Sequence, residues 1–178
     1  NTNFLEYEFK KKEKIGSGSF GTVYKSFSQK LNKDVALKMF REYISKENEN
    51  PKEEIIDEIK IMSERELVHV NIIQLFGITQ DPDTKDYGLV LQYANQGTLR
   101  AYLETHFSKL EWPDKFRMAR EIASGINYLH SKKIVHRDLH DKNVLVHNDS
   151  LIVADFGLSK LSDNTSKTHI HPNGFPAY

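Results

Sequence analysis

Polar and apolar side chains alternate in short runs over the first forty residues, and glycine, asparagine or aspartate interrupts the runs. Runs of this kind are typical of antiparallel β-strands. Two later apolar runs have the same character and lie on either side of the turn-forming sequence DPDTKD. The pattern therefore predicts five strands, within residues 8–16, 21–28, 34–40, 71–79 and 87–94.

Helical periodicity occurs in three places. Residues 52–66 carry Ile55, Ile59 and Met62 at a spacing that predicts an amphipathic helix. A short helix is expected over residues 98–106. A long helix is expected over residues 113–132, where a proline suits the first turn, and its core side is expected to consist of Phe116, Ala119, Ile122, Ala123, Ile126 and Leu129.

The last apolar runs, residues 144–148 and 151–157, predict two short strands around a turn at Asn148–Asp149. The chain then has two unlike halves joined by a short linker: a β-rich lobe with one helix over residues 1–94, and a helical lobe over residues 95–178. We therefore expect an α+β fold.

The charges of the chain cancel, because 25 lysines and arginines face 25 aspartates and glutamates. A neutral balance argues against general binding to nucleic acid or to membrane surfaces, which both require excess positive charge. No apolar run approaches the roughly 20 residues of a membrane-spanning helix. The absence of cysteine excludes disulfides and thiol chemistry, and it is consistent with a reducing, cytoplasmic compartment.

The sequence GSGSFG places glycines at positions 16, 18 and 21. A dinucleotide-binding fold would need a helix to start at the third glycine. Here Thr22, Val23 and Tyr24 follow it, which favours a strand–loop–strand hairpin laid over phosphates. A merely flexible hairpin would explain the glycines equally well if nothing else matched.

The sequence VALK ends in Lys38, on a predicted strand, where an ammonium group can reach the α- and β-phosphates of a nucleotide. Such a lysine needs a carboxylate partner to fix its position. Glu58 lies on the apolar side of the predicted helix 52–66 and is the preferred partner, with Glu54 as the second choice. Most other acidic residues of that helix are expected to be surface charges.

Two further motifs complete the set, HRDLHDKN at residues 136–143 and ADFG at residues 154–157. Asp138 can accept the proton of a substrate hydroxyl. Asn143 and Asp155 can hold magnesium, which prefers hard oxygen ligands and takes few of them from the protein. The order of all these motifs, each in a suitable strand, helix or loop, makes a chance match negligible.

The sequence resembles a eukaryotic-type protein kinase domain over about residues 7–178, and LVLQYANQGTLRAYL is similar to the tyrosine-kinase-like branch. The resemblance implies a bilobal fold whose helical lobe is incomplete after GFPAY, so the isolated chain is expected to be inactive. Leu91 would be the gatekeeper, and the backbone of Gln92 and Ala94 would meet adenine. The implied nucleotide-binding set is Ile15, Gly16, Ser17, Gly18, Ser19, Gly21, Val23, Ala36, Lys38, Leu91, Gln92, Ala94, Leu145 and Asp155.

The resemblance further implies a packed column joining the lobes, made of Met62, Leu75, His136 and Phe156. It predicts an enzyme of cell signalling that uses ATP and magnesium to phosphorylate protein hydroxyls. A non-catalytic module that binds nucleotide or a partner protein is the alternative. Neither the oligomeric state nor the choice between serine, threonine and tyrosine follows from the sequence.

The catalytic loop departs from the common family versions. His140 stands where serine/threonine kinases usually carry a lysine that reaches the γ-phosphate, and Lys142 stands where many tyrosine kinases carry an arginine. Phe175 replaces a threonine that contacts the catalytic aspartate in serine/threonine kinases. One hypothesis is that Lys142 supplies the cation for the γ-phosphate; the other is evolutionary drift with unchanged specificity.

Several weaker signals lie outside these motifs. The histidines of HIHP at residues 169–172 favour a solvated loop over a metal pair. Trp112 is expected in the core. Candidate phosphorylation sites, with Arg137 as a partner for the phosphate, or else plain loop hydroxyls, are Ser159, Ser162, Thr165, Ser166 and Thr168.

Overall fold

The structure is a computed structural model that describes residues 9–18, 21–40, 58–62 and 67–161. Several predicted features lie outside these residues: Glu54, Ser19, Phe175, the HIHP histidines, and the hydroxyls of Ser162, Thr165, Ser166 and Thr168. Within the described ranges, no helix has both the length and the apolar character needed to cross a membrane.

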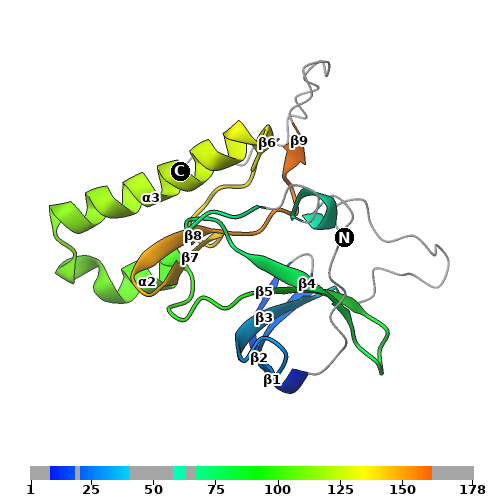
Figure 1. The fold of residues 1–178 in the computed structure, drawn as a ribbon. Coiled ribbons are helices and arrows are strands. Elements are labelled where there is room, and N and C mark those ends of the chain that lie inside the picture. The colour runs from blue at the N-terminus through cyan, green and yellow to red at the C-terminus, as the bar shows by residue number, and fades with distance from the viewer. Residues whose placement is uncertain (1–8, 19–20, 41–57, 63–66, 162–178) are drawn as a thin grey trace.

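One lobe is a five-stranded antiparallel sheet with strand order β1-β2-β3-β5-β4 (Figure 1). Its strands are β1 (Phe9–Gly18), β2 (Gly21–Ser28), β3 (Lys33–Met39), β4 (Leu75–Gln80) and β5 (Tyr87–Gln92). All five predicted strands are therefore confirmed. The helix predicted over 52–66 is described only at residues 58–62, which are helical.

The start predicted for β4 was wrong, because the strand begins at Leu75 and not at residue 71. The apolar residues that precede it are buried, but they face the other lobe. Ile72 forms a parallel bridge with Val153, and the amide of Ile73 donates to the Val153 carbonyl at 2.9 Å. The apolar run thus begins before the strand does, because Ile72 and Ile73 join the two lobes.

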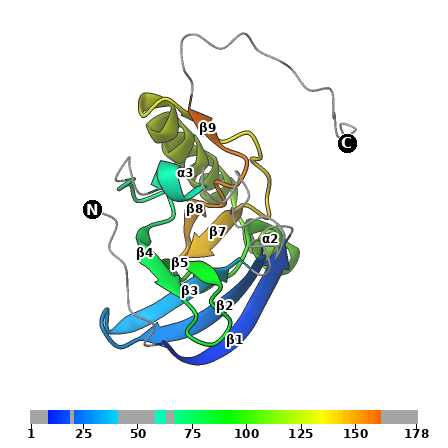
Figure 2. The same cartoon turned by 90° about the vertical axis from the view of Figure 1, so that its right-hand side faces the viewer.

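The second lobe carries the helices and two small antiparallel pairs, β6 with β9 and β7 with β8. In Figures 1 and 2 the β7–β8 hairpin lies between the sheet and the long helix α3. The predicted hairpin turn is confirmed, since Asn148 and Asp149 have φ angles of 49° and 61°, as a two-residue turn requires. The elements are α2 (Leu99–His106), η1 (Phe107–Lys109), α3 (Trp112–Ser131), β6 (Ile134–Val135), β7 (Val144–His147), β8 (Ser150–Val153) and β9 (Lys160–Leu161).

The predicted inner face of α3 was only partly right: Leu129 is buried and Ile122 and Ile126 pack against core clusters, but the other three predicted residues do not. The buried residues of the helix are Met118, Gly125 and Leu129, whereas Phe116 is 69% exposed and Ala119 and Ala123 are exposed as well. Gly125 shows why: a Cβ there would lie 2.7 Å from the carbonyl oxygen of Asn71. The close approach at this glycine, which an apolar pattern does not count, sets the rotation of the helix.

Trp112 does not lie in the core either, because it is 71% exposed at the start of α3. Its neighbours at the helix start are one aromatic ring and one cation. The ring centroid of Trp112 lies 5.9 Å from that of Phe116, and the Lys115 ammonium lies 5.3 Å from the Trp112 centroid. Aromatic side chains at a helix end can cover one another on the surface without reaching a core.

The main hydrophobic core runs through both lobes and contains the predicted column. Met62 and Phe156 are buried in one cluster, and Leu75 packs against it. The ring of the buried His136 completes the column, with its centroid 5.5 Å from that of Phe156. The fold is therefore α+β, with a β-rich lobe and a helical lobe that share one core.

Candidate active site

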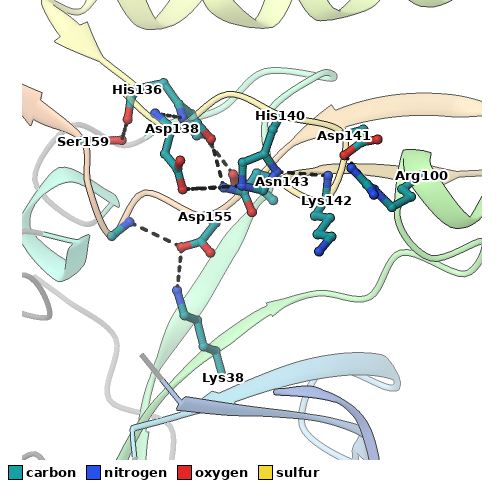
Figure 3. A network of polar contacts seen from close by, with 12 residues as sticks. Lys38, Arg100, His136, Asp138, His140, Asp141, Lys142, Asn143, Asp155 and Ser159 are labelled. Carbon is teal, nitrogen blue, oxygen red and sulfur yellow. Dashed lines mark hydrogen bonds and ion pairs between the residues drawn. The ribbon is translucent and has the colours of Figure 1, made fainter. Parts of the chain in front are cut away.

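A group of charges, of which Lys38 and Glu58 are buried and Asp155 is half-buried, lies where the two lobes meet. The Lys38 ammonium, on β3, lies 2.8 Å from both carboxylate oxygens of Glu58 and 2.9 Å from Oδ1 of Asp155. Glu58 is only 2% exposed. Figure 3 shows Lys38 extending from the sheet to Asp155 of the opposite lobe. The carboxylate expected beside Lys38 is thus in contact with it, and we call these three residues the inner cluster.

Burial and charge act in opposite directions on the inner cluster. Burial lowers the pKa of Lys38, but the carboxylates of Glu58 and Asp155 outweigh it and hold that pKa above its ordinary value of 10.5. Burial raises the pKa of Glu58, and Lys38 offsets this only partly. An ammonium shared evenly by the two carboxylate oxygens of Glu58 has the geometry of a charged pair.

Asp155 is held ionised in the same cluster. Burial raises its pKa, but the Lys38 ammonium outweighs this and the pKa lies below its ordinary value of 3.8. Its φ of 66° places it in the left-handed region, and Oδ1 also accepts a hydrogen bond from the amide of Gly157 at 3.4 Å. The carboxylate is therefore positioned by both the backbone and the lysine.

His136 connects the catalytic loop to the strand that precedes Asp155. Its Nε2 donates to the carbonyl of Ala154 at 3.0 Å, and its Nδ1 accepts from the amide of Asp138 at 3.3 Å. Burial lowers the pKa of His136 below its ordinary value of 6.5, so the ring is neutral at pH 7. One ring thus fixes both the loop and the end of β8.

Ser159 also belongs to this connection, because its hydroxyl donates to the His136 carbonyl at 3.1 Å. The residue is only 2% exposed. A hydroxyl in this position cannot receive a phosphate while the contact is present, so the interpretation of Ser159 as a phosphorylation site is wrong for this structure.

Asn143 orients the carboxylate of Asp138. The Asn143 side-chain nitrogen donates to the Asp138 carbonyl at 2.9 Å and to Asp138 Oδ2 at 3.0 Å, as Figure 3 shows. The side-chain nitrogen is therefore bound to Asp138, and the side-chain oxygen is the atom of Asn143 that could ligate a cation. In the described part of the chain no group of three histidines or acids could hold a metal by itself.

The donor set nevertheless fits magnesium. Asn143 and Asp155 offer hard oxygen ligands, and magnesium commonly takes only one or two ligands from the protein and the rest from phosphates and water. Both contacts of the Asn143 side chain with Asp138 use its nitrogen, which leaves its oxygen for a metal beside the ionised Asp155.

The outer side of the catalytic loop is exposed and is tied to α2. The Arg100 guanidinium lies 3.1 Å from Asp141 Oδ1, and the Arg100 amide donates to the Asp141 carbonyl at 3.1 Å. His140 Nδ1 accepts from the amide of Lys142 at 3.1 Å, and its Nε2 lies 3.6 Å from Asp138 Oδ2. We call Arg100, His140, Asp141 and Lys142 the outer cluster.

Comparison with known proteins decides the family. The family model described as protein tyrosine and serine/threonine kinase matches residues 9–175. The chain belongs to this family. The kinase fold predicted from the motifs is therefore confirmed, and the inner cluster and the catalytic loop occupy one region of a kinase domain.

Curated relatives of this kinase chain come from plants and animals. A leaf rust 10 disease-resistance locus receptor-like protein kinase-like 1.2 of Arabidopsis thaliana is 36% identical over 96% of the chain. LIM domain kinase 1 of Drosophila melanogaster is 35% identical over 85%, and tyrosine-protein kinase receptor svh-2 of Caenorhabditis elegans is 31% identical over 94%. The chain spans 26%, 12% and 15% of the lengths of these proteins.

Several residues of the predicted nucleotide-binding set lie on adjoining strands. Ala36 of β3 lies opposite Leu91 of β5, and Val23 of β2 lies opposite Lys38. Leu145 of β7 approaches from the other lobe, where it bridges to Thr98 at the start of α2. The nucleotide contacts of these residues stay a prediction.

The backbones of the linker and of the glycine hairpin are only partly available for contacts with a nucleotide. The amide of Gln92 donates to the carbonyl of Gln74 at 2.9 Å, so it is not available to adenine. At the hairpin, Gly21 has a φ of 153° and a Cβ there would collide with the carbonyl of Met39. Ile15 is exposed, and space is open around Gly16. A phosphate could approach the backbone closely at Gly16, whereas Gly21 is needed for its close contact with β3.

Two sets of contacts were not predicted from the sequence. Arg100 and Asp141 are 41 positions apart, and nothing in either local sequence indicates a pair. The side chains of Asn95 and Gln96 contact a turn 53 positions away. The only signal was the type of residue, since amides beside glycine commonly occur in turns and linkers.

Proposed function

We propose that the protein containing this chain is an ATP- and magnesium-dependent protein kinase that phosphorylates hydroxyl groups of other proteins. The observation that carries the proposal is the inner cluster, in which a buried lysine is fixed between two carboxylates opposite Asp138 and Asn143. Such an arrangement positions phosphates and balances their charge, which is most of what phosphoryl transfer requires.

Each side chain has a distinct part in the proposed reaction. Lys38 binds the α- and β-phosphates, and Glu58 holds Lys38 in place. The substrate oxygen forms a bond to the γ-phosphorus while the bond from that phosphorus to the oxygen of ADP breaks, and Asp138 takes the hydroxyl proton. Bound magnesium, held by Asn143 and Asp155, would neutralise charge on the phosphates.

Asp138 is oriented for this role by contacts on both sides. Its amide is bound to His136 at 3.3 Å, and its carboxylate is bound by Asn143 at 3.0 Å. A base held from its backbone and from its side chain loses little freedom when the substrate arrives, which lowers the entropic cost of reaching the transition state.

Lys142 is the proposed cation for the γ-phosphate. Its side chain is exposed, and in Figure 3 its ammonium points to the side of the loop on which Asp155 and Lys38 lie. His140 instead turns its Nε2 toward Asp138, at 3.6 Å from the carboxylate. This difference in direction supports Lys142, and not His140, as the residue that meets the phosphate.

The test uses the natural full-length protein that contains residues 1–178. We expect it to bind ATP with magnesium and to transfer labelled γ-phosphate to a general protein substrate, and phosphoamino-acid analysis of the product would identify the hydroxyl. ATP binding without any transfer, to protein substrates or to itself, would contradict the proposal and favour the non-catalytic module.

A further inference from the structure

Two consecutive linker residues hold the turn of the β7–β8 hairpin by reciprocal hydrogen bonds. Asn95 Nδ2 donates to Asn148 Oδ1 at 2.8 Å, and Asn95 Oδ1 accepts from the Asn148 amide at 3.0 Å. Gln96 Nε2 donates to Asp149 Oδ1 at 2.8 Å, and Gln96 Oε1 accepts from the Asp149 amide at 2.7 Å. We call these four residues the linker clamp.

The backbone next to the linker clamp is attached to the same lobe. The Gln96 amide donates to the Val146 carbonyl at 3.0 Å, and the Val146 amide donates to the Gly97 carbonyl at 2.8 Å. The turn is itself attached to α3, because Arg117 donates to the Asp149 carbonyl at 2.6 Å. The linker from Asn95 onward is therefore part of the helical lobe.

The residues just before the clamp are attached to the other lobe. Gln92 is the last residue of β5, and it pairs with Val35 of β3. The Tyr93 ring lies 4.6 Å beneath the ammonium of Lys25, which is on β2. Residues up to Tyr93 are thus bound to the β-rich lobe, and residues from Asn95 onward are bound to the helical lobe. Ala94 lies between these two parts of the linker.

We propose that the linker clamp positions the linker for the adenine base and confines the turning of the two lobes to Ala94. The proposal rests on the proposed function, since it takes ATP as the ligand. It also places the boundary between the lobes after residue 94, where the sequence predicts it. The clamp residues themselves are positioning residues and need not touch the nucleotide.

The expected effect follows from how the conformations of the linker are populated. If the linker is free, the arrangement that presents the Ala94 backbone to adenine is only one of several. The apparent dissociation constant of a ligand rises by the factor by which its binding-competent state is depleted. Loss of the clamp should therefore weaken ATP binding, while bound ATP at saturation restores the arrangement and leaves kcat nearly unchanged.

The chemistry of Gln96 and Asp149 allows a compensating pair of variants. Gln96→Glu removes the donor and sets two carboxylates against each other where the atoms are now 2.8 Å apart. Asp149→Asn alone keeps an acceptor for Gln96. In the double variant the new side-chain amide at position 149 donates to the new carboxylate at position 96, so the pair is restored with its polarity reversed. Asparagine also tolerates the left-handed φ of 61° at position 149.

The test measures KM for ATP, KM for a protein substrate, kcat and the melting temperature in the natural full-length protein. We expect Gln96→Glu to raise KM for ATP about fivefold, the scale of one lost hydrogen bond, with kcat and KM for the protein substrate within about twofold. Asp149→Asn and the double variant should lie close to wild type. Gln29→Glu adds the same charge at an exposed turn away from the clamp and serves as the matched control.

Three results would overturn the proposal: a Gln96→Glu variant with unchanged KM for ATP, a double variant as weak as Gln96→Glu, or equal losses in all kinetic constants with a lowered melting temperature. The last would show general destabilisation and not positioning. Failure of the proposed function is distinguishable, because then the wild-type protein itself would not transfer phosphate.

Discussion

The inner and outer clusters both flank Asp138, yet they are held in opposite ways. In the inner cluster the side chains of Lys38 and Glu58 are 10% and 2% exposed, and that of Asp155 is 37% exposed. In the outer cluster the side chains of Arg100 and Asp141 are 53% and 35% exposed, although their contact of 3.1 Å is nearly as short. Similar distances therefore hide a large difference in environment.

That difference indicates which cluster is indispensable. Charges taken out of water interact strongly, and removing one partner leaves the other stranded at high cost. Exposed charges are screened, and a pair of them typically contributes about 0–1 kcal/mol. We therefore expect the inner cluster to determine whether transfer occurs, and the outer cluster to adjust its rate.

The largest effect is expected from Lys38→Met. The variant should show no measurable phosphoryl transfer, because methionine cannot bind the phosphates and Glu58 would remain buried without its partner. Transfer assays of the full-length protein measure this. Lys33→Met, on the same strand, is the control and should stay active; an active Lys38→Met enzyme would refute the assignment of the inner cluster.

The outer cluster should respond less, and unevenly. We expect Lys142→Ala to lower kcat by roughly ten- to a hundredfold, the scale of losing one charge contact in the transition state. His140→Ala should cost much less, since the ring lies 3.6 Å from Asp138, beyond hydrogen-bonding distance. Steady-state kinetics of both variants decide the order, and a more damaging His140→Ala would contradict it.

A smaller effect concerns pH and stability. Because burial lowers the pKa of His136 below 6.5, the unfolded chain binds more protons as the pH falls below that value, so the contribution of His136 to stability is present above about pH 6.5 and is lost on acidification through the lowered pKa. Glu58 has the opposite effect on stability, because its pKa is raised above its ordinary value of 4.5. The folded chain then binds more protons than the unfolded chain, so the contribution of Glu58 is present below about pH 4.5 and is lost as the pH rises through the raised pKa.

A variant isolates the histidine from Glu58. Melting temperatures between pH 7.5 and 5.0 should fall less steeply in His136→Asn than in wild type. His130→Gln, at an exposed position of α3, should follow the wild-type slope. Equal slopes for all three proteins would exclude His136 as the source of the acid sensitivity.

The smallest effect is expected from Arg100→Ala. Removing this exposed partner of Asp141 should lower kcat by only about twofold, since a screened pair contributes about 0–1 kcal/mol. Steady-state kinetics beside Lys142→Ala measure the difference. A loss as large as that of Lys142→Ala would show that the outer cluster is not merely adjusting the loop, and the contrast between the clusters would fail.

Features that depend on nearby residues, such as strands and the apolar face of a helix, were predictable from the sequence. Strand alternation located β1, β2 and β3, and the apolar face of one helix identified Glu58 as the neighbour of Lys38. The inner face of α3 was predictable only in part, because Phe116, Ala119 and Ala123 have the spacing of a core face but are exposed, and the close approach at Gly125 depends on a distant loop.

Contacts between polar residues far apart in the chain could not be predicted from the sequence, for a different reason. Arg100, Asp141 and the linker clamp are exposed or half-buried, and exposed polar residues follow no periodicity. Their partners lie 41 and 53 positions away and are brought together only when the hairpin and α2 have packed. The motifs identified the chemistry, whereas the structure was needed to find what orients it.

The central claim is that Asp138 receives the hydroxyl proton in a site whose nucleotide contacts lie elsewhere. Measuring ATP affinity and phosphoryl transfer side by side in wild type and Asp138→Asn of the full-length protein tests it most directly. The account predicts ATP affinity within about twofold of wild type and transfer reduced by about a hundred- to ten-thousandfold, the contribution of general-base catalysis. An Asp138→Asn protein with wild-type turnover would contradict it.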